Sequence, residues 1–191
     1  MKKLILRLGF MSLMLVCLVG MLMWKEPMAQ HDDHHAEEQG NEMHSDVPFH
    51  PVTMADLERF HGHVGPFVAL GARMGEYAIT QYNLPRYFGI TVDAECPAIP
   101  PHACLIDGLM VSTGATYGKK NIHHIEANQI KVTIRDDRTG AYVVFTLKPS
   151  TLSLLKKWEE ENIPVPERGQ QCFDQKAEDL FDFEYFPATE K

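Results

Sequence analysis

Hydrophobic positions along the chain follow a helical period in some stretches and alternate with polar positions in others. From Pro66 the apolar residues recur every three or four positions, which predicts a helix that ends at residues 83–85. Similar periods predict three shorter helices, over residues 54–60, over residues 105–112, and from a cap at Ser150 or Thr151 through Trp158. Alternation predicts three strands, over residues 87–95, 129–135 and 141–147.

The order of these elements predicts the fold class. A turn over residues 136–140 joins the last two strands as a hairpin. Helix, strand, short helix, hairpin and helix together predict an α+β domain, in which helices pack on one face of a small, mostly antiparallel sheet. Gly71 and Gly75 lie four residues apart in the long helix, so we expect another backbone to approach that helix closely.

The N-terminal part of the chain lacks these periods. Residues 1–29 are typical of a signal peptide or an N-terminal membrane anchor, and both interpretations stay open. Their apolar run over residues 8–24 is free of charge and follows three basic residues, Lys2, Lys3 and Arg7. The chain is therefore expected to be exported, either to the periplasm or to the outer side of the cytoplasmic membrane.

Three further segments complete the expected organisation. Residues 30–48 are acidic and polar, which predicts a disordered linker whose histidines could bind metal loosely, namely His31, His34, His35 and His44. Residues 49–160 carry the helical and strand periods and form the predicted α+β domain. Residues 161–191 contain three prolines and an acidic, aromatic end, which predict an irregular C-terminal tail.

The charge of the chain excludes one class of partner. The net charge is −8 over 191 residues. Three of the 18 basic residues precede Lys25 and none of the 26 acidic residues does, so the chain from Lys25 onward carries −11. Such a surface repels a phosphate backbone, and we therefore expect no nucleic-acid partner. Whether the protein is a monomer or a homodimer stays open.

A pair of histidines, His61 and His63, lies where a regular helix is unexpected. Gly62, Gly65 and Pro66 interrupt the helical pattern around them, and Pro66 suits the first turn of a new helix. In an extended connection, side chains two residues apart fall on the same side. The pair therefore predicts either a metal site in a short connection or, alternatively, local packing and capping.

Cys104 is the candidate for a third metal ligand. It precedes a predicted helix, whose dipole favours the thiolate and is expected to lower the pKa of the thiol. Two imidazoles and one thiolate form a ligand set of catalytic zinc sites. The alternative is a disulfide, in which Cys96 pairs with Cys104 or Cys172 pairs with either of them.

Other residues are candidates for supporting roles. Asp107, one turn after Cys104, could orient a ligating imidazole or accept a proton, or it could merely complement the helix dipole. Lys119 belongs to a loop whose glycine spacing does not fit a nucleotide-binding motif. It could bind an anion or lie on the surface. Three single histidines are reserve ligands: His102, His123 and His124.

Three motifs together resemble the FmdE family of formylmethanofuran dehydrogenase over residues 50–150. They are Phe-His-Gly-His at residues 60–63, Cys104 followed three residues later by Asp107, and the glycine-containing loop over residues 113–121. The resemblance implies an α+β fold and one transition metal ion, most simply Zn²⁺, bound by His61, His63 and Cys104. The sequence departs from the family pattern by lacking thiolates, with Gly65 and Ala115 near positions where many members have cysteine.

The resemblance implies a fold and a metal site more firmly than a reaction. We therefore expect an exported metal-binding protein with an accessory or binding role, whose partners are a metal ion and a small-molecule ligand. One alternative is a metal-dependent enzyme that uses a metal-bound water, with Asp107 and Lys119 as its catalytic candidates. A second is a thiol-redox protein based on Cys96 and Cys104, although the sequence lacks a Cys-x-x-Cys motif. Any contact with the membrane is expected only through the N-terminal segment.

Overall fold

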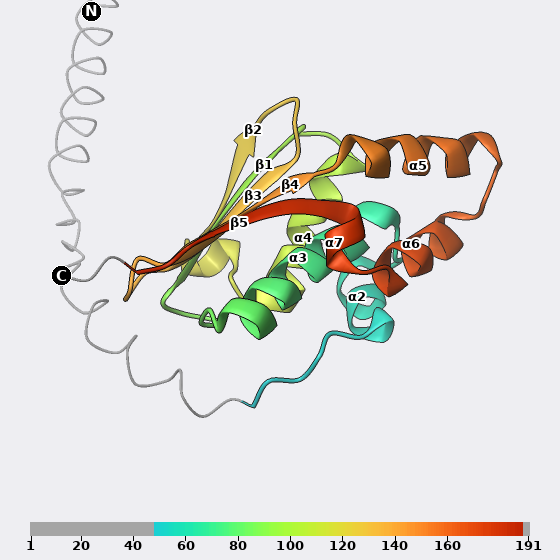
Figure 1. Cartoon of the computed structure of the whole chain (residues 1–191). Helices are drawn as coiled ribbons and strands as arrows, with labels where there is room; N and C mark the ends of the chain where they lie inside the picture. The colour runs from blue at the N-terminus through green and yellow to red at the C-terminus, as the bar shows by residue number, and fades with distance from the viewer. Residues whose placement is uncertain (1–47, 189–191) are drawn as a thin grey trace, which may run out of the picture. The chain divides into compact units, whose positions relative to one another are not determined.

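The computed structural model describes residues 48–188 (Figure 1). The predicted signal peptide or anchor and residues 30–47 of the predicted linker lie outside the described residues. Within the described part, no helix is both long and apolar enough to span a membrane.

The elements follow one another along the chain from α2 to β5. The α-helices are α2 (Met54–His61), α3 (Pro66–Tyr82), α4 (Leu105–Thr113), α5 (Pro149–Glu160), α6 (Val165–Asp174) and α7 (Ala177–Leu180). Two 3₁₀ turns are η1 (His102–Cys104) and η2 (Tyr117–Lys119). The strands are β1 (Ile90–Cys96), β2 (Ile122–Glu126), β3 (Lys131–Asp136), β4 (Tyr142–Leu147) and β5 (Phe181–Phe186).

The strands form one sheet in the order β2-β1-β3-β4-β5. Neighbouring strands are antiparallel except β1 and β2, which are parallel. Every second side chain of β1, β3 and β4 is buried, whereas those between are partly exposed. This is the period of a sheet that is covered on one face. Helices α3 and α4 lie beneath that face in Figure 1, so the predicted α+β fold is confirmed.

Helices α3 and α4 pack with their backbones almost in contact. A Cβ atom on Gly71 would lie 2.0 Å from the carbonyl oxygen of Leu105, and one on Gly108 would lie 2.0 Å from that of Val68. A Cβ atom on Gly75 would lie 2.0 Å from the hydroxyl of Ser112. The expected close approach to Gly71 and Gly75 is thus confirmed, and the partner is α4. The packing also fixes the start of α4 beside the start of α3.

The prediction of an irregular tail over residues 161–191 is wrong. Residues 165–186 form α6, α7 and β5, and β5 pairs with β4 at the edge of the sheet. Phe183 and Tyr185 alternate toward the helices, where their rings lie 4.9 Å from Tyr77 and 4.3 Å from Tyr82, respectively. The aromatic residues thus extend the core, and the domain continues well beyond residue 160.

Two of the prolines in that segment mark the beginning of α6. Pro164 is its N-cap and Pro166 lies in its first turn, where a missing N–H costs no helical hydrogen bond. A proline in the first turn also moves the start of α5 to a position before the predicted cap. Pro149 occupies its first turn and Lys148 its cap, so the predicted cap at Ser150 or Thr151 is wrong. Thr151 is buried instead and donates to the carbonyl of Leu180 at 2.8 Å.

Strand β2 was absent from the elements that periodicity predicted. Four of its five residues are exposed and only Ile122 is buried, so it lacks the alternation of a half-buried strand. It lies at the edge of the sheet and pairs in parallel with β1, from Val92 opposite Ile122 to Cys96 opposite Glu126. Its position is therefore decided by backbone pairing with β1.

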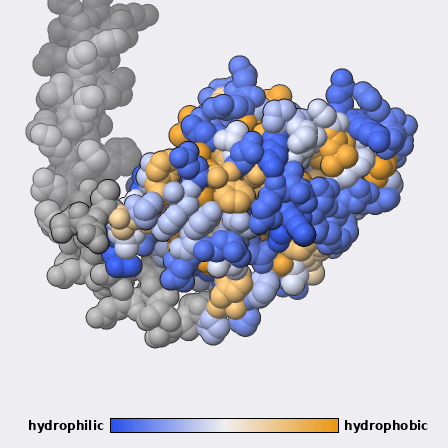
Figure 2. Space-filling view, in the orientation of Figure 1, coloured by the Kyte–Doolittle hydropathy of each residue, from blue (hydrophilic) through white to orange (hydrophobic). Residues whose placement is uncertain are grey.

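The surface in the view of Figure 2 is mostly hydrophilic, with apolar patches that include one near the α5 end of the domain. Leu152 on α5 and Val165 at the start of α6 are 44% and 38% exposed, respectively. These two apolar side chains belong to the wall of a pocket that also contains the candidate metal ligands.

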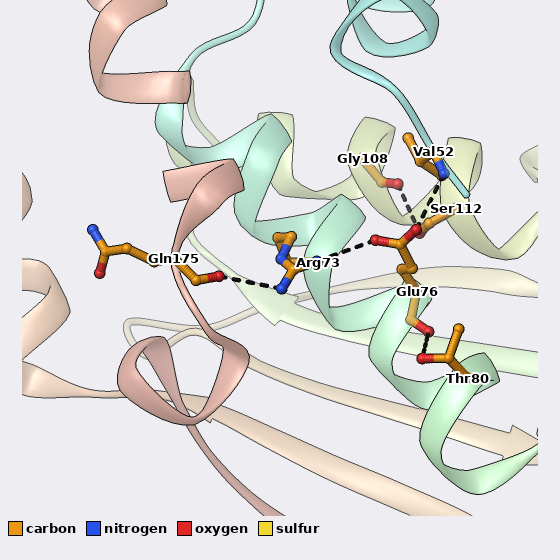
Figure 3. A network of polar contacts seen from close by, with 7 residues as sticks. All are labelled: Val52, Arg73, Glu76, Thr80, Gly108, Ser112 and Gln175. Carbon is orange, nitrogen blue, oxygen red and sulfur yellow. Dashed lines mark hydrogen bonds and ion pairs between the residues drawn. The ribbon is translucent and has the colours of Figure 1, made fainter. Parts of the chain in front are cut away.

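A polar network joins three segments of the chain around α3 (Figure 3). Arg73 donates to the carboxylate of Glu76 and to the backbone carbonyl of Gln175, each at 3.2 Å. The same carboxylate accepts the backbone N–H of Val52 at 3.2 Å. The network therefore holds both the segment before α2 and the residue after α6 against α3. The end of α6 is thereby fixed relative to the candidate site.

Candidate functional site

The two histidines lie at the junction of α2 and α3. His61 is the last residue of α2, and Gly62 caps this helix in a left-handed conformation with φ of 89°. His63 lies in the connection, and α3 begins at Pro66. The imidazole rings lie side by side, with centroids 4.9 Å apart and planes inclined by 39°. The predicted short connection before a helix start is thus present, with His61 one residue inside the preceding helix.

Asp107 orients the ring of His61. The Nδ1 atom of His61 lies 2.6 Å from the carboxylate of Asp107, which belongs to the first turn of α4. The side chain of His61 is only 13% exposed, so little water competes for this hydrogen bond. With Nδ1–H donating to the carboxylate, Nε2 keeps its lone pair for a ligand. This arrangement of carboxylate and imidazole is common among metal-ligating histidines.

Cys104 is the N-cap of α4 and is half-buried. The predicted lowering of its pKa is wrong, because burial and the negative charge of Asp107 raise the pKa of the thiol. The helix start offers little compensation, since η1 leads directly into α4 and the N–H of Leu105 is already bonded to the carbonyl of His102. The raised pKa favours the protonated thiol, so a cation that binds Cys104 would have to displace its proton.

The disulfide alternative is not realised among the described residues. Cys96, Cys104 and Cys172 are all free. Cys96 and Cys172 are buried, and burial raises the pKa of Cys172 to about 12. Of the three, only Cys104 combines partial exposure with a position in the pocket wall.

A pocket of about 450 Å³ lies beside the histidine pair. Its wall includes His61, His63 and Cys104, and also residues of α5 and α6. Helix α6 reaches this position because it packs directly on the connection, where a Cβ atom on Gly169 would lie 2.3 Å from the carbonyl oxygen of Val64. The pocket thus combines groups that can bind a metal with a wall from the C-terminal part of the chain.

The three predicted ligands share the pocket without converging on one point. Among residues 48–188, no group of three or more His, Cys, Asp or Glu side chains is arranged to hold a metal ion. The histidine pair and its supporting carboxylate are assembled, whereas Cys104 lines the same wall separately. A metal held by all three would therefore require a side-chain rearrangement. His63 is exposed, which leaves it room for such a movement.

The reserve histidines are divided between two places. His102 lines the pocket, and its ring lies 4.7 Å from that of Phe67. His123 and His124 belong to β2, where their ring nitrogens contact other groups. The first bonds with Asp93 at 2.8 Å and the second with the carbonyl of Cys96 at 3.0 Å.

Lys119 does not line the pocket. Its ammonium donates to the carbonyl of Gly114 and lies 5.0 Å from the ring centroid of Phe88. Burial lowers the pKa of Lys119. Of the two catalytic candidates, Asp107 is thus engaged with His61, and Lys119 belongs to a different environment.

The sequence pattern did not point to the residues that α6 contributes to the pocket. Val165 and Arg168 line it, and Gly169 and Cys172 on the same helix are buried. These positions follow a helical spacing of three to four residues, a signal that was present in the sequence. The neighbouring prolines obscure this spacing, because proline is typical of an irregular segment as well as of a helix start.

The known proteins that are similar to this chain over part of its length include the following two. The chain is 35% identical over 89 residues to a "Probable S-adenosyl-L-methionine-binding protein" of Archaeoglobus fulgidus. That match covers 45% of this chain and only 24% of the relative. A solved tungsten formylmethanofuran dehydrogenase FmdE-like protein from Syntrophus aciditrophicus is similar, with a TM-score of 0.48, 21% identity and 71% of each chain covered.

The family comparison covers most of the described domain. The model of the family described as "FmdE, Molybdenum formylmethanofuran dehydrogenase operon" matches residues 60–185. This range begins just before the histidine pair and ends within β5, so it includes α6 and the rest of the pocket. Because the match covers more than half of the chain, this protein belongs to the FmdE family.

Proposed function

We propose that this protein is an exported metal-binding member of the FmdE family with a binding or accessory role. The proposed metal is Zn²⁺, held by His61, His63 and Cys104. The observation that carries the proposal is the 2.6 Å hydrogen bond from His61 to Asp107 beside a second imidazole in the wall of a pocket. A carboxylate in this position raises the basicity of the imidazole and fixes its ring, which favours metal binding.

The chemistry of the three side chains fits zinc. Imidazole nitrogen and thiolate sulfur are ligands that Zn²⁺ prefers, and three protein ligands leave one position for a small molecule. That position would be accessible from the pocket of about 450 Å³. When bound, the metal would act as a Lewis acid toward that small molecule. The residues of this chain contribute the donor atoms, the orientation of His61 and partial exclusion of water.

The two alternative functions receive less support from the geometry. For an enzyme, Asp107 would serve as a base, but its carboxylate already binds His61. Lys119 lies outside the pocket wall. For a thiol-redox protein, Cys96 and Cys104 would form a reversible disulfide, but Cys96 is completely buried in the β-sheet core. The binding role uses Asp107 in the position that it already occupies, and it requires neither Lys119 nor a disulfide of Cys96.

Replacing Asp107 by asparagine should lower the affinity for Zn²⁺ by about 10- to 100-fold, the range typical of lost outer-shell support. The amide keeps the size of the carboxylate but cannot stabilise the imidazole in the same way. The measurement is competition with a chromogenic zinc chelator, using the whole chain so that the histidine-rich segment is the same in every sample.

The matched control for this change is Asp93→Asn. Asp93 contacts His123 at 2.8 Å, in a His–Asp pair of similar geometry that lies away from the pocket. We expect the control to retain the zinc affinity of the unmodified chain. Equal affinities in the two variants would contradict the proposed role of Asp107 and the metal site with it.

The proposal of export rests on the basic start and the charge-free apolar run over residues 1–29. A reporter enzyme that is active only outside the cytoplasm, fused after residue 48, should be active in cells. The same fusion without residues 1–29 should be inactive. Activity of a cytoplasm-specific reporter at the same position would overturn the proposal of export.

A further inference from the structure

Arg168 lines the pocket, and its guanidinium has no polar partner among the described residues. Among residues 48–188, its guanidinium makes no hydrogen bond or ion pair, and its Nε atom is shielded from solvent. A guanidinium that has lost part of its hydration is usually paired with an anion or with carbonyl groups. The terminal nitrogens of Arg168 are therefore available to a ligand in the pocket.

Two other arginines, Arg73 and Arg86, also have a shielded Nε atom, but their guanidinium groups have polar or aromatic partners. Arg73 donates to Glu76 and to the carbonyl of Gln175. Arg86 contacts two aromatic rings, with centroid distances of 5.3 Å to Phe49 and 4.8 Å to Tyr87. Within residues 48–188, Arg168 has neither kind of partner, and it is the one of the three that lines the pocket of the candidate site.

The position of Arg168 is fixed by the packing of its helix. The next residue, Gly169, is in backbone contact with the connection that carries His63, since a Cβ there would lie 2.3 Å from the carbonyl oxygen of Val64. At its end, α6 is held by the hydrogen bond from Arg73 to Gln175. Arg168 is thus presented to the pocket by a rigid helix and not by a free loop.

The remaining wall favours a ligand with one negative charge and an apolar part. Lys156 and Glu159 also line the pocket, and together with Arg168 they leave one net positive charge. A single carboxylate matches this net charge, whereas a doubly charged phosphate exceeds it and is repelled more strongly by the carboxylate of Glu159. The apolar part of the wall includes Leu152, Leu155 and Val165.

A further polar atom lies in the same wall. The Nδ1 atom of His102 is buried and has no hydrogen-bond partner among the described residues. Its ring packs on Phe67 and lines the same pocket as Arg168.

We propose that this pocket binds a small monocarboxylate with a short hydrocarbon chain. The carboxylate pairs with the guanidinium of Arg168, and the hydrocarbon chain lies along Leu155 and Val165. The proposal deepens the proposed function, in that the bound molecule is the small ligand expected beside the metal, but the anion subsite itself contains none of the three metal ligands.

The experiment is an NMR titration of the whole chain, in zinc-loaded and in chelator-treated form, with sodium butyrate, sodium hexanoate and the uncharged hexanamide. Hexanoate should bind about tenfold more tightly than butyrate, because each buried methylene contributes a few-fold in affinity. Hexanamide should bind at least about tenfold more weakly than hexanoate, because it lacks the charge that pairs with Arg168.

Three variants locate the anion subsite. Arg168→Gln should lower the affinity for hexanoate by about tenfold or more, and Arg168→Lys should recover part of the loss. Arg138→Gln removes the same charge from a side chain that is 73% exposed in the β3–β4 hairpin, and it should leave the affinity unchanged. Thermal unfolding of each variant verifies that it is folded.

The outcomes distinguish this proposal from that of the metal site. Binding of hexanoate that is equal in Arg168→Gln and Arg138→Gln, or absent in both forms of the unmodified protein, would overturn the carboxylate subsite. Loss of zinc binding in Asp107→Asn has no bearing on it. Conversely, a chain that binds hexanoate through Arg168 but binds no zinc would support the subsite and contradict the proposed metal function.

Discussion

Replacing Gly108 by alanine should destabilise the domain by about 2 kcal/mol or more, because the added methyl group has no space. Its Cβ would lie 2.0 Å from the carbonyl oxygen of Val68 and 2.7 Å from the amide nitrogen of Ala72. Both are backbone atoms of α3, so no side chain can rotate away and α4 itself must move. This cost exceeds the gain of about 1 kcal/mol that alanine has over glycine in a helix. Urea denaturation measures the difference.

Gly118→Ala is the matched control for this substitution. Gly118 has no heavy atom within 4 Å of an added Cβ, apart from its chain neighbours. The free energy of unfolding of Gly118→Ala should therefore differ from that of the unmodified protein by only about 0.5 kcal/mol. If Gly108→Ala and Gly118→Ala unfold at the same urea concentration, the close packing of α3 and α4 is wrong. Since α4 carries Asp107, Gly108→Ala should also weaken zinc binding.

Replacing His61 by alanine or Cys104 by serine should lower the affinity for Zn²⁺ by about 100-fold or more, because each change removes one of three proposed ligands. The raised pKa of Cys104 makes zinc binding depend on pH. Binding requires loss of the thiol proton, so the affinity should increase as the pH rises toward the pKa of the free thiol. The measurement is zinc per chain after dialysis against a mild chelator.

Cobalt substitution separates the proposed site from the histidine-rich N-terminal segment. Co²⁺ bound to a thiolate has a charge-transfer absorption band, which the histidines outside the described residues cannot produce. This band should be present in the unmodified chain and absent in Cys104→Ser. His124→Ala should retain it, because that imidazole lies on β2 and bonds to the carbonyl of Cys96 on β1, away from the pocket. Full zinc binding in Cys104→Ser would exclude Cys104 as a ligand.

Local sequence patterns determined much of the fold. The helix from Pro66 and the hairpin of β3 and β4 are where the apolar periods predicted them. Such periods reflect which side of an element is buried, and they can be recognised without knowing what covers it. For the same reason, the break around Gly62 located the connection that contains His63, and the spacing of Gly71 and Gly75 predicted a close helix contact.

The sequence alone therefore determined the α+β class, the main helix, the hairpin and the histidine pair, because each depends on residues close together in the chain. Only the tertiary structure decided that β5 completes the sheet, that Asp107 reaches His61 across 46 residues, and that Arg168 faces the same pocket. It also reversed the expected direction of the pKa shift of Cys104, because burial and the charge of Asp107 outweigh the helix start. These features depend on which distant segments meet, and on how much water they exclude, and neither is encoded in a local period.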